Sequence, residues 1–226
     1  GLLHALERYG RLDRATVMAP AIELAERGFP VSFTLSNTLT SPWGQRLLAN
    51  PAAKSYLFRP DGSVYQPGEI LRQPDLAWTL RQIAERGTAG FYEGPVADRL
   101  VAEMERGGGL ITRRDLKQYR ALEREPVRGS FHGFEIVSMP PPSSGGVHLV
   151  QMLNVLEGFP LREMQLNSAA YIHALAETMK RAYADRSKHL GDPDFHRVPV
   201  AELTSRTYAA QLRAAIDPER ATPSAA

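Results

Sequence analysis

Apolar residues recur every three or four positions along most of this 226-residue chain, which is the spacing of one helix face. The pattern predicts two helical regions, residues 1–120 and 145–216, separated by a strand hairpin over residues 126–139. Within these regions we expect helices over residues 2–9, 13–28, 32–47, 74–87, 90–106, 146–157, 168–190 and 204–216, and a short one from Thr112. The chain is therefore predicted to be α+β and dominated by helices.

Local signals support several of these boundaries. Asp13 and Ser32 are residue types that accept hydrogen bonds at helix N-termini, and Thr112 followed by Asp115 is a short analogue of a capping box. Residues 50–73 are less regular, and their proline and glycine clusters indicate turns around a short strand. Residues 217–226 are polar and rich in alanine, so we expect a poorly ordered tail.

The predicted hairpin has apolar residues on both faces. Two runs, residues 126–131 and 134–139, meet at His132 and Gly133, a plausible hairpin turn. A lone two-stranded hairpin is marginally stable in water, and this one looks like part of a larger buried sheet. We therefore expect other segments, outside this chain, to complete the sheet.

The most distinctive stretch joins the second strand to a helix. Three prolines, two serines and two glycines occupy residues 140–146. Proline cannot donate to a sheet ladder and favours extended geometry in the residue before it. A nucleophilic role for Ser143 or Ser144 is disfavoured, because the Gly-x-Ser-x-Gly elbow is absent. We favour the alternative that both hydroxyls cap a helix beginning near Gly146.

Composition excludes several classes of protein. The net charge is +2, and the 27 basic residues are interspersed with acids, which argues against a nucleic-acid surface. The absence of cysteine removes disulfides, thiolate zinc sites and cysteine nucleophiles. No apolar run approaches the roughly 20 residues needed to span a bilayer. The chain begins with Gly1 instead of Met, which suggests a processed or truncated piece.

Titratable residues give no convincing catalytic or metal-binding set. The six histidines lack metal-ligand spacing; they are His4, His132, His148, His173, His189 and His196. Acidic residues near the end of the long helix are expected to pair with Arg181 or Arg186 and to cap a turn; they are Asp185, Asp192 and Asp194. Glu157, Glu177 and Asp185 do not form a pair close enough to act on one bond.

The long helix also carries a row of large side chains at core-like spacing. We expect this row to pack against the rest of the molecule. Its members are Tyr171, Leu175, Met179 and Ala182, with Tyr183 beside them.

Several motifs in the same order resemble the γ-glutamyltransferase (γ-glutamyltranspeptidase) family. The resemblance runs from near Gly1 to about Ala209. The matching segments are residues 20–25 (PAIELA), 28–31 (GFPV), 90–94 (GFYEG), 108–116 (GGLITRRDL), 138–146 (SMPPPSSGG), 182–187 (AYADRS) and 190–195 (LGDPDF).

The resemblance implies part of an N-terminal-nucleophile hydrolase, a four-layer αββα sandwich made as one precursor that cuts itself into a large and a small subunit. The cut exposes a threonine that is nucleophile and, through its own amine, base. Glutathione and other γ-glutamyl amides are the implied donors, no cofactor is implied, and family members are usually periplasmic or extracellular.

The resemblance covers the middle and C-terminal part of the large subunit. It places the threonine and most substrate-binding residues beyond Ala226, and the arginine that binds the substrate carboxylate before Gly1. No catalytic, substrate-binding or metal residue is carried over, because Thr222-Pro223 does not fit the cleavage junction and Arg113 and Arg186 lie in structural motifs.

We therefore expect this chain alone to be inactive and to need the small subunit of the same precursor. The alternatives are an acylase of the same fold acting on β-lactam side chains, a transferase acting on poly-γ-glutamate, and a non-catalytic scaffold that kept the fold.

Overall fold

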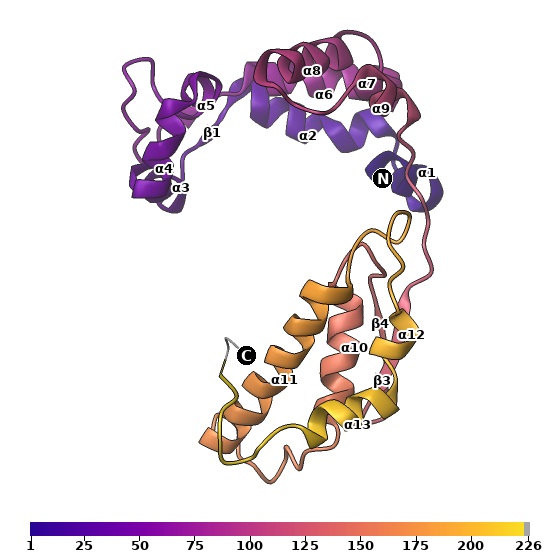
Figure 1. Ribbon diagram of the computed structural model, residues 1–226. Helices are drawn as coiled ribbons and strands as arrows, with labels where there is room; N and C mark the ends of the chain where they lie inside the picture. The colour runs from indigo at the N-terminus through magenta and orange to yellow at the C-terminus, as the bar shows by residue number, and fades with distance from the viewer. Residues whose placement is uncertain (224–226) are drawn as a thin grey trace. The chain divides into compact units, whose positions relative to one another are not determined.

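The computed structural model describes residues 1–223 and is dominated by helices, as predicted (Figure 1). It divides into two compact units, Gly1–Leu122 and Glu123–Ala226, and each is described by itself. The last three residues of the predicted tail, 224–226, lie outside the described residues. None of the described helices is both long and apolar enough to cross a membrane.

The first unit is built around two helices that pack side by side, α2 (Arg14–Arg27) and α6 (Pro74–Arg86). Asp13 caps α2 as predicted, because its Oδ1 accepts a hydrogen bond from the backbone N–H of Thr16 at 2.9 Å. Arg14 donates to the carbonyl of Ala84 at 2.8 Å and ties the start of α2 to the end of α6. The remaining helices of this unit are α1 (Leu2–Tyr9), α3 (Phe33–Thr40), α4 (Pro42–Arg46), η1 (Leu47–Ala49), α5 (Pro51–Leu57), α7 (Ala89–Tyr92), α8 (Gly94–Gly107) and α9 (Arg113–Gln118).

Three sequence predictions for this unit are corrected. The single helix expected over residues 32–47 is broken at Ser41, which caps α4 by accepting from the N–H of Gly44 at 3.2 Å. Pro42 favours this break because it has no N–H to continue α3. The helix expected over residues 90–106 is likewise interrupted before Gly94, whose φ is +64°. Helix α5 was missed altogether, although Asn50 caps it.

The sequence predicted one short strand within residues 50–73 but missed its pairing with another strand. β1 (Phe29–Pro30) pairs antiparallel with β2 (Ile70–Leu71), in register Phe29↔Leu71. Strands of two residues are too short to show an alternating pattern. Their pairing depends on a contact across about forty residues of sequence, which local signals do not encode.

The second unit contains the predicted hairpin. β3 (Val127–Phe131) pairs antiparallel with β4 (Phe134–Ser138), and the turn lies at His132 and Gly133 as predicted. Both turn residues have positive φ, +47° and +87°, as a type I′ turn requires. The helices of this unit are α10 (Gly145–Leu156), α11 (Ala169–His189), α12 (Val200–Leu203) and α13 (Arg206–Ala214).

Helix α10 is the centre of the second unit and packs against β3, β4, α11, α12 and α13 (Figure 1). Its Val147 and Val150 form a core with Val127 and Leu203. Gly129 allows this approach, because a Cβ there would lie 2.6 Å from the side chain of Val150.

Two apolar side chains of β4 are exposed in the part of the chain that the structure describes. Phe134 is 74% exposed and Val137 is 52% exposed. Both residues were expected to be buried, in a sheet that other segments complete. Helix α10 packs on the face of the hairpin that carries Gly129 and Ile136. Phe134 alternates onto the same face but remains exposed, whereas Val137 lies on the opposite face.

Candidate functional site

Polar side chains of helix α11 form the most extensive buried network in the second unit. The residues of α11 that are buried are Ala174, Glu177, Thr178 and Ala182. The prediction of the packed face was therefore wrong for Leu175, Met179 and Tyr183, which are exposed. The inward face of α11 is offset from that row and carries a carboxylate.

Glu177 is the centre of this network and is only 1% exposed. Its Oε1 accepts from Lys180 Nζ at 2.7 Å and from the backbone N–H of Thr222 at 3.0 Å. Its Oε2 accepts from Arg181 Nη1 at 2.7 Å. Two cations and one amide thus compensate the buried charge, which would otherwise be costly.

These partners also determine the protonation of Glu177. Burial alone raises the pKa of a carboxyl group, but the hydrogen bonds from Lys180, Thr222 and Arg181 outweigh it. The pKa of Glu177 therefore lies far below its ordinary value of 4.5, and the side chain is a carboxylate at neutral pH.

The C-terminal segment runs beside α11 and is bonded to it at several points. His173 Nε2 lies 2.8 Å from the carbonyl oxygen of Asp217, and Arg181 Nη2 donates to the carbonyl of Ala215 at 2.5 Å. Lys180 Nζ donates to the carbonyl of Thr222 at 2.7 Å. Residues 217–223 form no helix or strand, and the segment expected to be poorly ordered is bonded to α11 through residues 217 and 222.

A second carboxylate of α11, Asp185, faces α10 and α13. It accepts from the hydroxyl of Tyr208 at 2.9 and 3.0 Å and from Gln151 Nε2 at 2.5 Å. Burial and the neighbouring Asp185 raise the pKa of Tyr208 to about 12, so this phenol stays protonated and donates. The predicted pairing of Asp185 with Arg181 or Arg186 is replaced by these neutral donors.

His148 is the most buried of the six histidines that the sequence singled out, and its ring lies 5.7 Å from that of Tyr183. Burial and the charge of Arg186 lower its pKa, against the opposing effect of Asp185. Within residues 1–223 its Nε2 has no hydrogen-bond partner, and neither do Gln151 Oε1 and Thr178 Oγ1.

The serines after the prolines contact groups that do not activate a nucleophile. Ser143 Oγ accepts from the N–H of Gly145 at 3.2 Å, so it caps α10 as expected. Ser144 does not cap the helix; its Oγ accepts instead from Arg186 Nε at 3.3 Å. A backbone amide and a guanidinium are both donors, and neither takes a proton from a hydroxyl.

A close backbone contact explains why residue 146, at the junction between β4 and α10, is a glycine. A Cβ on Gly146 would lie 2.1 Å from the carbonyl oxygen of Met139, so only glycine allows the end of the hairpin to approach the start of α10 this closely.

The other candidate acids are held in ion pairs or turns. Asp192 Oδ1 accepts from the N–H of Asp194 at 3.0 Å, as predicted for a capped turn, and Asp194 pairs with Arg124 at 2.6 Å. Glu157 forms an ion pair with Arg206. In the region covered by the structure, no three His, Asp or Glu residues gather as metal ligands.

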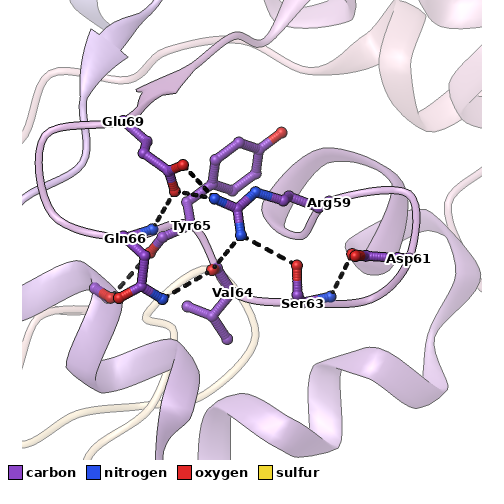
Figure 2. Close-up of polar contacts among 8 residues, drawn as sticks. Arg59, Asp61, Ser63, Val64, Tyr65, Gln66 and Glu69 are labelled. Atoms are coloured by element: carbon purple, nitrogen blue, oxygen red, sulfur yellow. Dashed lines mark hydrogen bonds and ion pairs between the residues drawn. The ribbon is translucent and has the colours of Figure 1, made fainter.

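In the first unit, the most concentrated polar cluster closes the loop before β2 (Figure 2). Arg59 Nη1 donates to Ser63 Oγ and to the carbonyl of Val64, both at 3.2 Å, and Nη2 contacts the carboxylate of Glu69. Glu69 also accepts from the N–H of Gln66 at 2.5 Å.

The cluster lowers the pKa of Glu69, first through the Gln66 amide and then through Arg59, against the effect of burial. Figure 2 shows the guanidinium lying between Glu69 and the turn at Ser63. Because all these partners belong to the loop itself, the cluster fixes the loop. Arg113, singled out from the sequence as a tempting carboxylate binder, pairs with Asp98 of α8.

Comparison with known proteins covers the chain from end to end. The family model for gamma-glutamyltranspeptidase matches residues 1–226. The glutathione hydrolase proenzyme of Pseudomonas sp. (strain A14) is 46% identical over 224 residues, which are 98% of this chain and 38% of that protein. The acylase ACY 1 proenzyme of Pseudomonas sp. (strain SE83) is 45% identical over 98% of this chain and 39% of its own length.

The fold has solved relatives. The crystal structure of Helicobacter pylori gamma-glutamyltranspeptidase superimposes with a TM-score of 0.93 and 42% identity, covering 98% of this chain and 63% of that chain. This chain spans well under half the length of the curated relatives above.

Proposed function

Because this chain belongs to the gamma-glutamyltranspeptidase family, we propose that it is a large-subunit portion of an enzyme that transfers or hydrolyses γ-glutamyl groups. The donors would be glutathione and other γ-glutamyl amides. The nucleophile would be a threonine outside this chain, exposed when the precursor cuts itself into two subunits, with its own amine as base.

The observation that carries the proposal is the family match over residues 1–226, together with 46% identity over 224 residues to a glutathione hydrolase proenzyme. The word proenzyme describes a precursor that is processed. The matched span is 38% of that proenzyme but 63% of the crystallised Helicobacter pylori chain, as expected if the crystallised chain is one subunit of a cleaved precursor.

Two exposed apolar residues of the hairpin support the same assignment. Phe134 and Val137 are apolar and exposed in this chain alone, and burying such side chains is favourable. A small subunit that packs against the hairpin would cover them. The chain would then supply one layer of helices and two strands, and its partner would supply the nucleophile and the substrate pocket.

A second candidate activity rests on the 45% identity to the acylase ACY 1 proenzyme. An acylase of this fold would use the same nucleophile on a different acyl group. Because the large-subunit portion matches both relatives almost equally, the pocket of the small subunit distinguishes the two activities.

The test uses the full-length precursor. We expect it to split into two subunits and to release aniline product from a γ-glutamyl anilide, while the isolated 226 residues release none. A precursor that turns over only a β-lactam side-chain amide would establish the acylase activity. A precursor with no threonine at the junction and no turnover of either substrate would support the alternative of a non-catalytic scaffold.

A further inference from the structure

Helix α11 carries a row of apolar side chains that stays largely exposed in the part of the chain covered by the structure. The members of the row follow one another at intervals of three or four residues, so they lie on one face of the helix. They are Ile172, Leu175, Met179 and Tyr183, which are 54%, 36%, 39% and 51% exposed. We call these four residues the α11 row.

The charged side of α11 is already in contact with the chain itself. Between residues 172 and 183, every His, Glu, Lys and Arg side chain bonds a backbone group of the C-terminal segment. This arrangement reverses that of an ordinary surface helix, which turns its polar side to water and its apolar side to the core. Contact with solvent therefore does not explain the α11 row. The bonded side chains are His173, Glu177, Lys180 and Arg181, and their partners are Asp217, Thr222 and Ala215.

The exposed apolar surface extends from α11 to its neighbour α10. The two helices pack side by side (Figure 1), and the ring of Tyr183 lies 5.7 Å from that of His148 on α10. The residue after His148 is Leu149, which is apolar and 39% exposed. Exposed apolar patches of this kind mark sites of interaction with another protein surface. In layered folds, neighbouring helices bury such side chains against a sheet.

We propose that the α11 row is an interface of this chain with the second subunit of the processed precursor. This inference rests on the proposed function and adds a helix face to the contact surface of the hairpin. This chain spans 63% of the crystallised Helicobacter pylori chain but 38% of the Pseudomonas proenzyme. If the crystallised chain is the first subunit, more of the length outside this chain belongs to the second subunit than to the first.

The fold favours the same occupant. An αββα sandwich places each layer of helices on a sheet. The described strands of the second unit, β3 and β4, pack on α10, whereas α11 packs on α10 and α13. A sheet supplied by the second subunit would lie against α11 and bury the row, which is favourable for apolar side chains. A second copy of this chain would bring two identical rows together and would leave the sheet layer unfilled.

The first experiment identifies the neighbour of the row in the full-length, processed protein. The photo-reactive amino acid benzoylphenylalanine replaces Tyr183, an aromatic residue of similar shape. In the matched control it replaces Ala184, the next residue, which is also exposed but lies about 100° further round the helix. After irradiation, mass spectrometry of the peptides locates the cross-linked segment.

The second experiment places a charge in the row. Met179→Glu sets a carboxylate against the proposed apolar partner, and removing that charge from water is costly. We expect the association of the processed subunits to weaken about tenfold or more. Met179→Leu keeps the apolar contact and Ala184→Glu places the charge outside the row, so both should stay within about twofold of native. Association is measured as the concentration at which the subunits separate on dilution in a fixed, non-denaturing concentration of urea.

We expect cross-links to the second subunit from position 183 and none from position 184. In an enzyme that is cleaved and active, the inference is overturned if position 183 cross-links only to the first subunit or to a second copy, or forms no cross-link. Subunits of Met179→Glu that associate as tightly as native ones also overturn it. If Met179→Glu does not fold, the cross-link from position 183 decides. A native precursor that neither cleaves nor turns over a γ-glutamyl anilide overturns the proposed function instead.

Discussion

Replacing Glu177 by glutamine tests how the buried carboxylate of α11 contributes to stability. The substitution keeps the shape of the side chain and removes its charge, so Lys180 and Arg181 lose a charged acceptor. Hydrogen bonds to charged groups are worth about 1.5–3 kcal/mol each. Removing one partner of a buried ion pair costs about 3–5 kcal/mol. Because Lys180 is partly exposed, we expect a loss of about 2–4 kcal/mol at pH 7.

The pH dependence provides a sharper test of the same substitution. The pKa of Glu177 is lower in the folded chain than its ordinary value of 4.5, so near that pH the unfolded state binds more protons. The contribution of the carboxylate is therefore fully present above pH 4.5 and is lost as the pH falls toward the folded pKa. The difference in unfolding free energy between native and Glu177→Gln chains should shrink as the pH is lowered below 4.5.

The assay is urea unfolding of the 226-residue chain at a series of pH values. Glu163→Gln is the matched control, because Glu163 is exposed, and we expect it to change stability by less than about 0.5 kcal/mol. A Glu177→Gln chain as stable as the native one at pH 7, or a difference that stays constant down to pH 3, would refute the assignment of Glu177 as a stabilising carboxylate.

Two further predictions concern residues of the second unit. Gly146→Ala should destabilise the chain by about 1–3 kcal/mol in urea unfolding, because the new methyl group would overlap the carbonyl of Met139. The control Gly107→Ala, where a Cβ meets nothing within 4 Å, should be neutral or stabilising, and equal effects would contradict this account. Tyr208→Phe should cost about 1–3 kcal/mol because it removes a donor from Asp185, and an unchanged midpoint would show that this hydrogen bond contributes nothing.

The sequence predicted features that depend on neighbouring residues. The caps at Asp13 and Ser32 and the capping box of Thr112 with Asp115 all form, because each bond joins residues three apart. The hairpin turn at residues 132–133 is equally local. The family was also evident from the sequence, because its motifs are contiguous segments.

The sequence did not predict features that depend on distant partners. The inward face of α11 was assigned to large apolar side chains, whereas the buried position is Glu177. Its burial is possible because Thr222, 45 residues further along the chain, supplies an amide. In the same way, the loop of residues 59–69 is held by the contact between the Arg59 guanidinium and the Glu69 carboxylate, which are ten residues apart. From sequence, a charged residue is ordinarily assigned to the surface, because burying it without a partner is costly. A partner that is distant in the sequence removes this cost, and local patterns do not reveal such a partner.

The central claim is that this chain belongs to the large subunit of a self-processed γ-glutamyl enzyme whose nucleophile lies outside residues 1–226. The most direct measurement treats the processed full-length protein with an electrophilic γ-glutamyl analogue and locates the covalent label by mass spectrometry. The account predicts a single label on the N-terminal threonine of the second subunit, competed by glutathione. A label on any residue of this chain, such as Ser143 or Ser144, would contradict it.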